Sequence, residues 1–328
     1  MAQYVVRRLL LFIPTLLLIS IVSFTLIQLP PGDYLTTYVS QLAASGDRVD
    51  QAQLAALEKR YGLNQPLYKQ YLKWMRNLLQ GDMGISWQWN KPVTQLIWGR
   101  LALTLLLSLS SLLFIWIVGI PVGIYSATHQ YSAGDYIFTI VGFIGMGIPN
   151  FMIALVLMWV GFSYFGADVG GLFSSEFQSA PWSIAKVIDL LKHLWVPVVV
   201  LGTSGTAWEI RSTRANLLDE IRKPYVTTAR AKGLKESRLL WKYPVRVAMN
   251  PFFSTVGYVL PELVSGSTII SVVLSLPTTG PLLLSSLMGQ DMFLAGSFLM
   301  MLSILTVIGT LISDILLAWV DPRIRYAE

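Results

Sequence analysis

The chain has 328 residues, of which 54% are hydrophobic and only 13% are charged. A soluble globular protein of this length needs far fewer apolar side chains, so the composition predicts a protein of the lipid bilayer. The absence of cysteine excludes a disulfide framework and a thiolate metal site. The net charge of +6 would suit nucleic acid, but membrane proteins gather Lys and Arg on their cytoplasmic side for another reason, and we expect no nucleic-acid partner.

The first predicted transmembrane helix is the uncharged run Leu9–Leu29, which is long enough to cross roughly 30 Å of hydrocarbon. Arg7 and Arg8 precede this run and predict a cytoplasmic N-terminus. A secretory signal peptide is the alternative interpretation, but the run exceeds the usual hydrophobic region and no small-residue cleavage site follows it. We therefore interpret residues 1–29 as a cytoplasmic N-terminus and a retained first span.

The polar interval of residues 30–100 predicts a small helical subdomain outside the cytoplasm. Helices are expected at Gln51–Tyr61 and at Leu67–Leu79, where apolar residues recur at helical spacing. Four tryptophans in this interval offer faces that could stack on a sugar ring: Trp74, Trp87, Trp89 and Trp98. Tryptophan at such positions more commonly packs a small domain or marks the membrane interface, and both interpretations stay open.

Residues 101–328 are predicted to form a core of five further spans. Gly119 and Gly123 in the second span would let a neighbouring helix approach closely, and Gly and Pro loosen the third span around Asn150. The fourth span is expected to continue as helix to Glu220, and a short helix precedes it at Trp182–Leu191. The five predicted spans are Leu101–Ala127, Tyr136–Phe165, one beginning with His193–Ala207, Phe252–Leu276 and Met292–Val320, with the apolar but short Leu282–Leu287 before the last.

The most densely charged stretch, Tyr225–Asn250, follows the fourth span. Pro224 can begin a short helix, and Gly233 can end it in the left-handed conformation. A second helix is expected from Leu234 to about Tyr243, where Pro244 breaks the pattern. The stretch is therefore predicted to be a bent pair of short amphipathic helices.

On the second of these helices, Lys235, Arg238 and Lys242 share one stripe, and Leu239, Leu240 and Tyr243 lie roughly a quarter turn away. A basic cytoplasmic loop that only fixes membrane orientation is the alternative. Ten Lys and Arg residues lie between Arg211 and Arg246, whereas the outer turn before the sixth span has none. This bias predicts six transmembrane helices with both termini in the cytoplasm.

No catalytic constellation is present in the sequence. Both histidines are isolated, and there is no nucleophile elbow, no HExxH motif and no phosphate-binding loop, so we predict no catalytic, cofactor-binding or metal-binding residue. Glu262 lies in the middle of the fifth span, where a carboxylate must face a partner, a cavity or a permeation path. A structural bond is at least as plausible there, so Glu262 and Asn150 are only candidate residues of a translocation pathway.

Several strings, taken in order, resemble permease subunits of binding-protein-dependent ABC importers of the dipeptide and oligopeptide branch. Tyr225–Leu234 resembles the EAA-type cytoplasmic loop of those subunits, and the similarity covers nearly the whole chain. Each string is weak alone, but their order and spacing are specific. The other similar strings are Tyr4–Asp33, Tyr61–Pro66, Gly81–Ser86 and Asp321–Arg325.

This resemblance implies the all-α type I importer permease fold in a prokaryotic inner membrane. It implies a second, related permease as heterodimer partner, two ATPase subunits that bind ATP and Mg²⁺, and an extracytoplasmic solute-binding protein. Peptides are the implied substrate, although close relatives carry oligosaccharides or metal chelates. A secondary transporter or channel that needs no ATPase is the alternative from another class.

By position, Thr227, Thr228 and Ala229 stand where the loop's Glu-Ala-Ala would stand, and Gly233 matches its glycine. The first two positions depart from that pattern, so a basic residue would supply the polar contact to the ATPase instead, while the apolar stripe would pack into an ATPase groove. Within a cytoplasmic loop of residues 211–250, the resemblance thus implies a coupling site comprising Thr227, Thr228, Ala229, Arg230, Lys232, Gly233, Leu234, Lys235, Arg238, Leu239, Leu240 and Tyr243.

Overall fold

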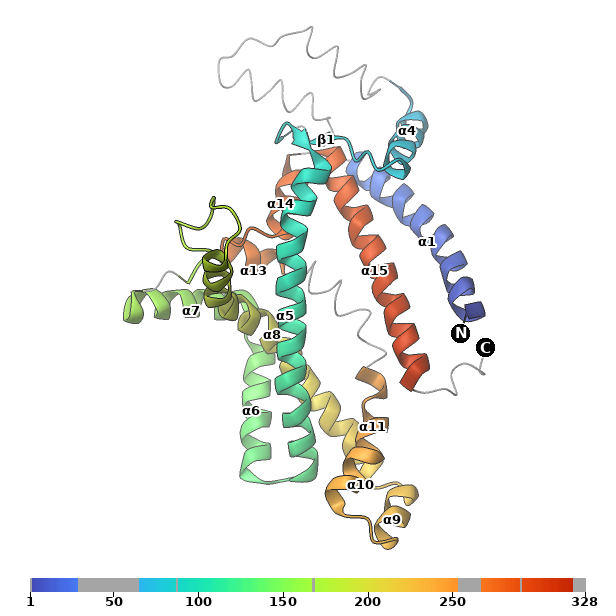
Figure 1. Ribbon diagram of the computed structural model, residues 1–328, viewed down its shortest axis with the longest axis vertical. Helices are drawn as coiled ribbons and strands as arrows, with labels where there is room; N and C mark the ends of the chain where they lie inside the picture. The colour runs from blue at the N-terminus through green and yellow to red at the C-terminus, as the bar shows by residue number, and fades with distance from the viewer. Residues whose placement is uncertain are drawn as a thin grey trace. The chain divides into compact units, whose positions relative to one another are not determined.

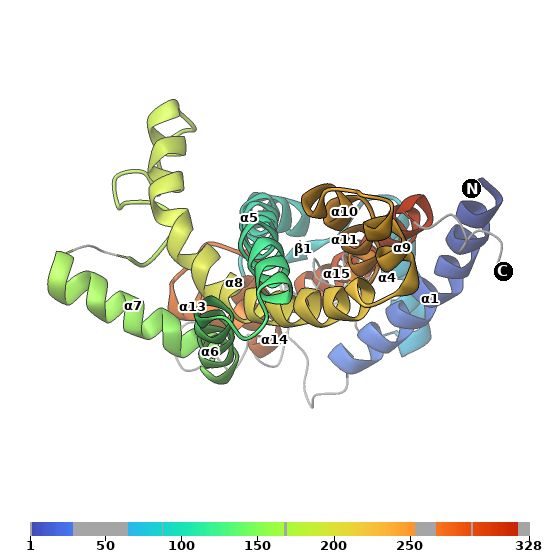
Figure 2. The ribbon, with the colours of Figure 1, turned by 90° about the horizontal axis from the view of Figure 1, so that it is seen from below.

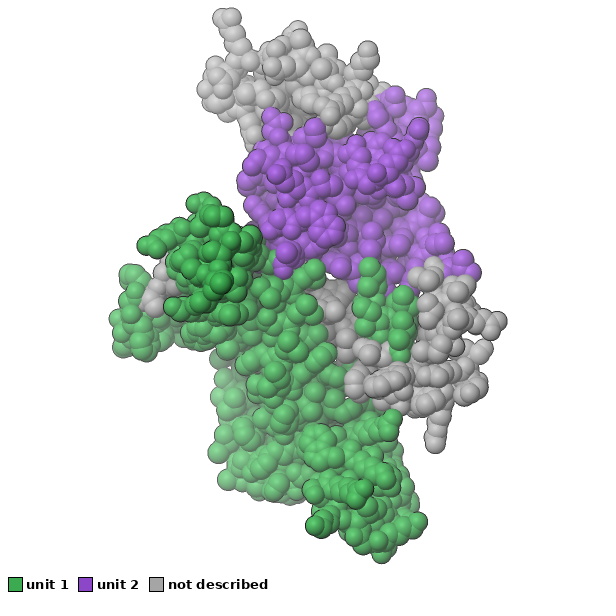
Figure 3. Space-filling view, in the orientation of Figure 1, with its two compact units in different colours: residues 1, 103–277, 308–328 green, residues 2–102, 278–307 purple. Residues whose placement is uncertain are grey.

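The computed structural model describes residues 2–28, 65–86, 88–166, 169–252, 267–289 and 291–320, and these residues are mostly helical (Figure 1). They divide into two compact units, coloured separately in Figure 3. Unit 2 comprises residues 2–102 and 278–307, and unit 1 comprises residue 1 with residues 103–277 and 308–328. The boundaries fall inside two helices, α5 (Val93–Thr128) and α15 (Met292–Val320). The predicted division at residues 29 and 100 stays a prediction.

Unit 2 contains α1 (Ala2–Gln28), α4 (Leu67–Leu79), α14 (Thr279–Met288) and the first parts of α5 and α15. Helix α4 has the predicted bounds, and the Phe24 ring of α1 lies 5.9 Å from the Trp74 ring of α4. Trp74 is only 4% exposed, so it packs this unit and offers no face to a sugar. The other helix predicted in this region, Gln51–Tyr61, lies outside the described residues.

A two-stranded antiparallel sheet in unit 2 pairs β1 (Ile85–Ser86) with β2 (Lys91–Pro92), in the register Ile85 to Pro92. Asp291, which is fully buried, connects this hairpin to α15. Its carboxylate accepts a hydrogen bond from the Ser86 hydroxyl at 2.5 Å and another from the Leu294 N–H at 3.2 Å in the first turn of α15. A carboxylate in that position also interacts favourably with the helix dipole.

Unit 1 is built around α8 (Ile184–Ile221), against which α6, α7 and α11 pack. Helix α8 is continuous, so the short helix predicted at Trp182–Leu191 and the fourth span are one element. The remaining elements of this unit are α6 (Ala133–Gly147), α7 (Asn150–Phe165), α9 (Pro224–Ala231), α10 (Glu236–Lys242), α11 (Pro244–Ala248) and α13 (Thr268–Val273).

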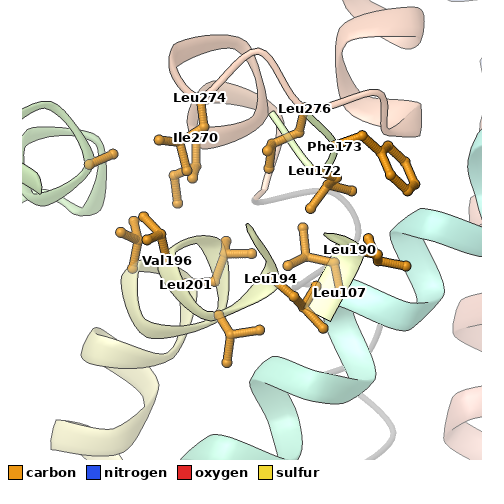
Figure 4. Packing of buried hydrophobic residues seen from close by; sticks show 13 residues of the cluster. Leu107, Leu172, Phe173, Leu190, Leu194, Val196, Leu201, Ile270, Leu274 and Leu276 are labelled. Atoms are coloured by element: carbon orange, nitrogen blue, oxygen red, sulfur yellow. The ribbon is translucent and has the colours of Figure 1, made fainter. Parts of the chain in front are cut away.

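An apolar cluster joins α5, α7, α8 and α13 in unit 1 (Figure 4). Leu107 of α5, Leu194 of α8 and Leu274 after α13 are among its buried members. The backbone N–H of Gly171 donates to the carbonyl oxygen of Leu274 at 2.7 Å and so fixes the loop before α8 on this cluster.

The structure corrects the third predicted span. Tyr136–Phe165 was expected to be one loosened helix, but α6 and α7 meet at an angle of 100°, and Figure 2 shows α7 leading away from α6. Pro149 causes the break because it has no N–H to donate and restricts the residue before it. Among the described residues, α5 and α15 are long and apolar enough to cross a membrane, and the bent pair would be a third span. Most of the fifth predicted span, residues 253–266, lies outside the described residues.

Glycines allow α5 and α8 to cross at close range, as predicted for Gly119 and Gly123. A Cβ atom on Gly119 would lie 2.9 Å from the Cβ of Glu209, and one on Gly123 would lie 2.7 Å from the Cβ of Thr213. Helix α8 also has glycines where it meets α5. A Cβ atom on Gly202 of α8 would lie 2.5 Å from the Phe114 ring of α5. Such contacts replace the hydrophobic driving force that is missing between helices in lipid.

Replacing Gly123 with alanine is expected to destabilise the protein. The new methyl group would also lie 3.0 Å from the Ile210 carbonyl oxygen, so α5 must move away from α8. Overpacking of this kind costs about 1–3 kcal/mol. The melting temperature of the detergent-purified complex should fall, whereas Gly142→Ala, whose methyl group would meet the Cβ of Ala207 at an ordinary 3.8 Å, should leave it unchanged or higher. Equal melting temperatures for Gly123→Ala and Gly142→Ala would contradict the close contact of α5 and α8 at Gly123.

Candidate functional site

Helices α9 and α10 form a bent pair, residues 224–243, which we call the elbow. Gly233 has φ of +77°, the left-handed conformation predicted for it, and its N–H donates to the Arg230 carbonyl oxygen at 3.0 Å. The second helix begins at Glu236, two residues later than expected, because Lys235 has extended backbone. Pro244 ends the elbow and also begins α11, where its fixed φ suits a first helical position.

A small apolar cluster holds the two helices of the elbow together. Val226 and Ala229 of α9 are buried against Leu239 of α10, with Leu234 and Tyr243 packed around them. Leu239 has no exposed surface, so the expectation that it packs into an ATPase groove is wrong. The apolar stripe of α10 faces α9 instead, because burying it there removes the apolar surface of both helices from water. Leu240, half-buried, is outside this cluster.

An ion pair also closes the elbow. The Arg230 guanidinium donates to both carboxylate oxygens of Glu236, one of them at 3.1 Å from Nε, and these bonds lower the pKa of Glu236. Arg230 is therefore engaged within the chain, which makes it a poorer candidate for the contact with an ATPase. Thr227 and Thr228 are exposed on α9, and the Thr228 hydroxyl donates back to the Pro224 carbonyl oxygen at 2.9 Å.

Four cations remain exposed on the elbow and form no ion pair with a described residue. They are Lys232, Lys235, Arg238 and Lys242. The stripe predicted from the sequence for three of them is thus present on the surface of α10. Because no carboxylate of the described chain neutralises it, this stripe can attract an acidic surface on another molecule.

Glu220 joins the elbow to α8. Its carboxylate accepts a hydrogen bond from the Lys223 ammonium and one from the Tyr225 hydroxyl, both at 2.5 Å. Burial disfavours the charge on Glu220, but these two bonds outweigh it and lower the pKa of this carboxyl. Burial and the bond to Glu220 raise the pKa of Tyr225 well above its ordinary value, so its hydroxyl stays a donor. The carboxylate at the end of α8 therefore fixes the turn between α8 and α9 through one bond to the turn and one to α9.

Helix α11 attaches the elbow from its other end. Val245 and Ala248 of α11 are buried with Leu217 of α8 and Ala127 of α5. The elbow is thus held at both ends, by the Glu220 joint and by this cluster, and is expected to move together with the C-terminal half of α8.

A buried ion pair fixes α6 to the same half of α8. The carboxylate of Asp135, which is 3% exposed, accepts bonds from Arg214 Nε and Nη2, each at 2.9 Å. It also accepts the Tyr131 N–H at 3.0 Å, and the Ser132 hydroxyl caps α6 by accepting the Asp135 N–H. This pair was missed in the sequence, because no local pattern links residues so far apart.

Of the two candidate pathway residues, the structure describes Asn150. Asn150 lies at the start of α7, directly after the bend, and its side-chain oxygen accepts the Ser204 hydroxyl of α8 at 2.5 Å. Glu262 lies outside the described residues. Glu209, for which the sequence suggested no role, is 4% exposed on α8 and accepts the Thr213 hydroxyl at 2.8 Å. The pathway assignment stays a prediction.

Known proteins resemble this chain over its whole length. The family model described as binding-protein-dependent transport system inner membrane component matches residues 119–326, and the model for the N-terminal part of such components matches residues 1–110. The oligopeptide transport system permease protein AppB of Bacillus subtilis (strain 168) is 38% identical over 330 residues, covering 99% of this chain and 100% of the relative.

Two further relatives cover 99% of this chain and 100% of their own length. The dipeptide transport system permease protein DppB of Alkalihalophilus pseudofirmus is 31% identical over 343 residues. The glutathione transport system permease protein GsiC of Escherichia coli O6:H1 is 30% identical over 326 residues. The chain belongs to the family of binding-protein-dependent transport system inner membrane components, the permease subunits of ABC importers.

Proposed function

We propose that this chain is one permease subunit of an ATP-driven importer that takes up dipeptides and oligopeptides delivered by an extracytoplasmic solute-binding protein. Members of its family are non-catalytic membrane subunits of such systems. The names of relatives that transport oligopeptides, dipeptides and glutathione support peptides as the substrate class. A second, related permease completes the membrane part, and ATP and Mg²⁺ bind to two partner ATPase subunits rather than to this chain.

The proposed topology has six spans in the inner membrane of a prokaryote, with both termini in the cytoplasm and residues 30–100 outside. The basic residues between Arg211 and Arg246 support this orientation, because short cytoplasmic loops of membrane proteins are enriched in Lys and Arg. Helix α5, which contains the second predicted span and begins eight residues before it, and α15, which has the bounds of the sixth, support the span assignment.

The observation that carries the proposal is a basic elbow that is closed by its own apolar cluster and ion pair and fixed to the long helix α8. Closure of the ATPase pair on ATP would move the elbow as a rigid body. The Glu220 joint and the α11 cluster would pass this movement to α8, and the Asp135–Arg214 pair would pass it on to α6. The helices that line the pathway would then move, and the pathway would open alternately to the cytoplasm and to the outside of the membrane.

Uptake of a radiolabelled dipeptide by proteoliposomes tests this function. With both permeases, both ATPases and the binding protein present, we expect uptake that requires ATP and stops when the binding protein is omitted. The permease pair alone should take up nothing. Equal uptake by the permease pair without ATPases would instead identify a secondary transporter or channel, and competition by an oligosaccharide or a metal chelate, but not by dipeptides, would contradict the peptide assignment.

A further inference from the structure

The outer surface of α10 carries one large aromatic side chain, Trp241, which is 65% exposed. Arg238 precedes it by three residues, so these two side chains are neighbours on the helix surface, and Lys242, four residues after Arg238, flanks Arg238 on the other side. Leu239, which fills the core of the elbow, lies nearly opposite Trp241 on this helix. We call Lys235, Arg238, Trp241 and Lys242 the docking face.

The elbow uses this face at one point, where the Lys242 ammonium lies 5.4 Å from the centre of the Tyr243 ring. Trp241 forms no ring contact with a described residue, and the three cations form no ion pair within the described chain. A single exposed tryptophan is common on protein surfaces. Here it lies among three unneutralised cations on a helix that its own apolar core and the Arg230–Glu236 pair already hold in place. The face is therefore preorganised for another molecule.

A lipid surface is a poor match for the docking face. A helix that lies in the membrane interface buries a broad apolar face of several large side chains. In α10 the apolar stripe is turned inward against α9, which leaves Trp241 as its one large apolar side chain that is mostly exposed. Figure 1 shows the elbow at one end of unit 1, reaching past the turn that joins α5 and α6. Both observations favour a protein partner in the aqueous phase.

We propose that Trp241 is the anchor by which this chain binds its ATPase subunit, inserting into an apolar pocket that carboxylates surround. The inference rests on the proposed function. Interface energy concentrates in a few buried aromatic and arginine side chains, and tryptophan is the residue most enriched among them. Lys235, Arg238 and Lys242 meet the carboxylates at the rim of the pocket and speed the encounter, and the indole fills the apolar pocket itself.

The test measures the affinity of the purified ATPase subunit for the permease pair in nanodiscs. Trp241→Ala should weaken binding about 30-fold, the loss typical of a central interface anchor, and Trp241→Phe should recover part of it. Trp98→Ala is the matched control, since Trp98 is 63% exposed on α5, and should leave the affinity unchanged. Arg238→Gln should slow association and reduce its dependence on salt.

The outcomes separate this inference from the function on which it rests. Wild-type affinity in Trp241→Ala, with the wild type binding its ATPase, would overturn the anchor and leave the importer assignment intact. A loss that appears only in nanodiscs with anionic lipid would assign Trp241 to the membrane and also overturn the anchor. Failure of the wild-type pair to bind any ATPase subunit would remove the proposed function itself.

Discussion

Replacing Asp135 with alanine is expected to destabilise the permease by about 3 kcal/mol, because it leaves the Arg214 guanidinium partly buried without its partner. The two bonds from Arg214 and the bond from the Tyr131 N–H would all be lost. For a chain of 328 residues, the apparent melting temperature of the purified complex should fall by roughly 4 °C. Binding-protein-stimulated ATPase activity should also fall, because α6 would no longer follow α8.

A double-mutant cycle distinguishes this pair from an ordinary surface contact. Asp135→Ala combined with Arg214→Ala should be no less stable than Asp135→Ala alone, because the uncompensated charge is removed. Arg230→Ala is the matched control, since it breaks an exposed ion pair, and should change the melting temperature little. If Asp135→Ala and Arg230→Ala melt at the same temperature, the buried pair does not fix α6 to α8.

The elbow was predictable because its determinants are local. Pro224 and Gly233 mark the two ends of a short helix by their own backbone preferences, and both do so in the structure. The helical wheel separated the cations from Leu239 correctly. It could not show whether the apolar stripe faces a partner protein or α9, because that choice depends on tertiary packing. Trp241 was missed for the same reason, since its exposure depends on which side of α10 the neighbouring helix covers.

The positions of the long helices in the sequence were predictable, but the way in which they bend was not. Met292–Val320 has the predicted bounds because an apolar run of membrane length admits few alternatives. Residues 136–165 contain glycines and a proline. These residues predict a weakened helix, but they predict neither the angle nor the direction of a bend. The direction depends on contacts with α8, such as the bond between Ser204 and Asn150 and the close approach of Thr203 to Gly145.

The second large effect is expected at the core of the elbow, where Ala229→Glu should reduce binding-protein-stimulated ATPase activity at least roughly tenfold while the permease still inserts in the membrane. Ala229 is 7% exposed between Val226 and Leu239, so a carboxylate there must separate α9 from α10 to reach water. Thr227→Glu is the matched control. It adds the same charge at an exposed position of α9, at the position where the EAA-type loop has its glutamate, and should keep the activity.

Gly233→Pro should uncouple transport by an independent route. Proline fixes φ near −65°, whereas Gly233 has φ of +77° and donates its N–H to Arg230, so the turn between α9 and α10 cannot form. Gly233→Ala keeps the N–H and costs only about 1–2 kcal/mol of strain, so its loss of activity should be intermediate. An ordered series from wild type through Gly233→Ala to Gly233→Pro would tie coupling to the shape of the elbow. Wild-type stimulation in both Ala229→Glu and Gly233→Pro would show instead that the ATPase does not act through this segment.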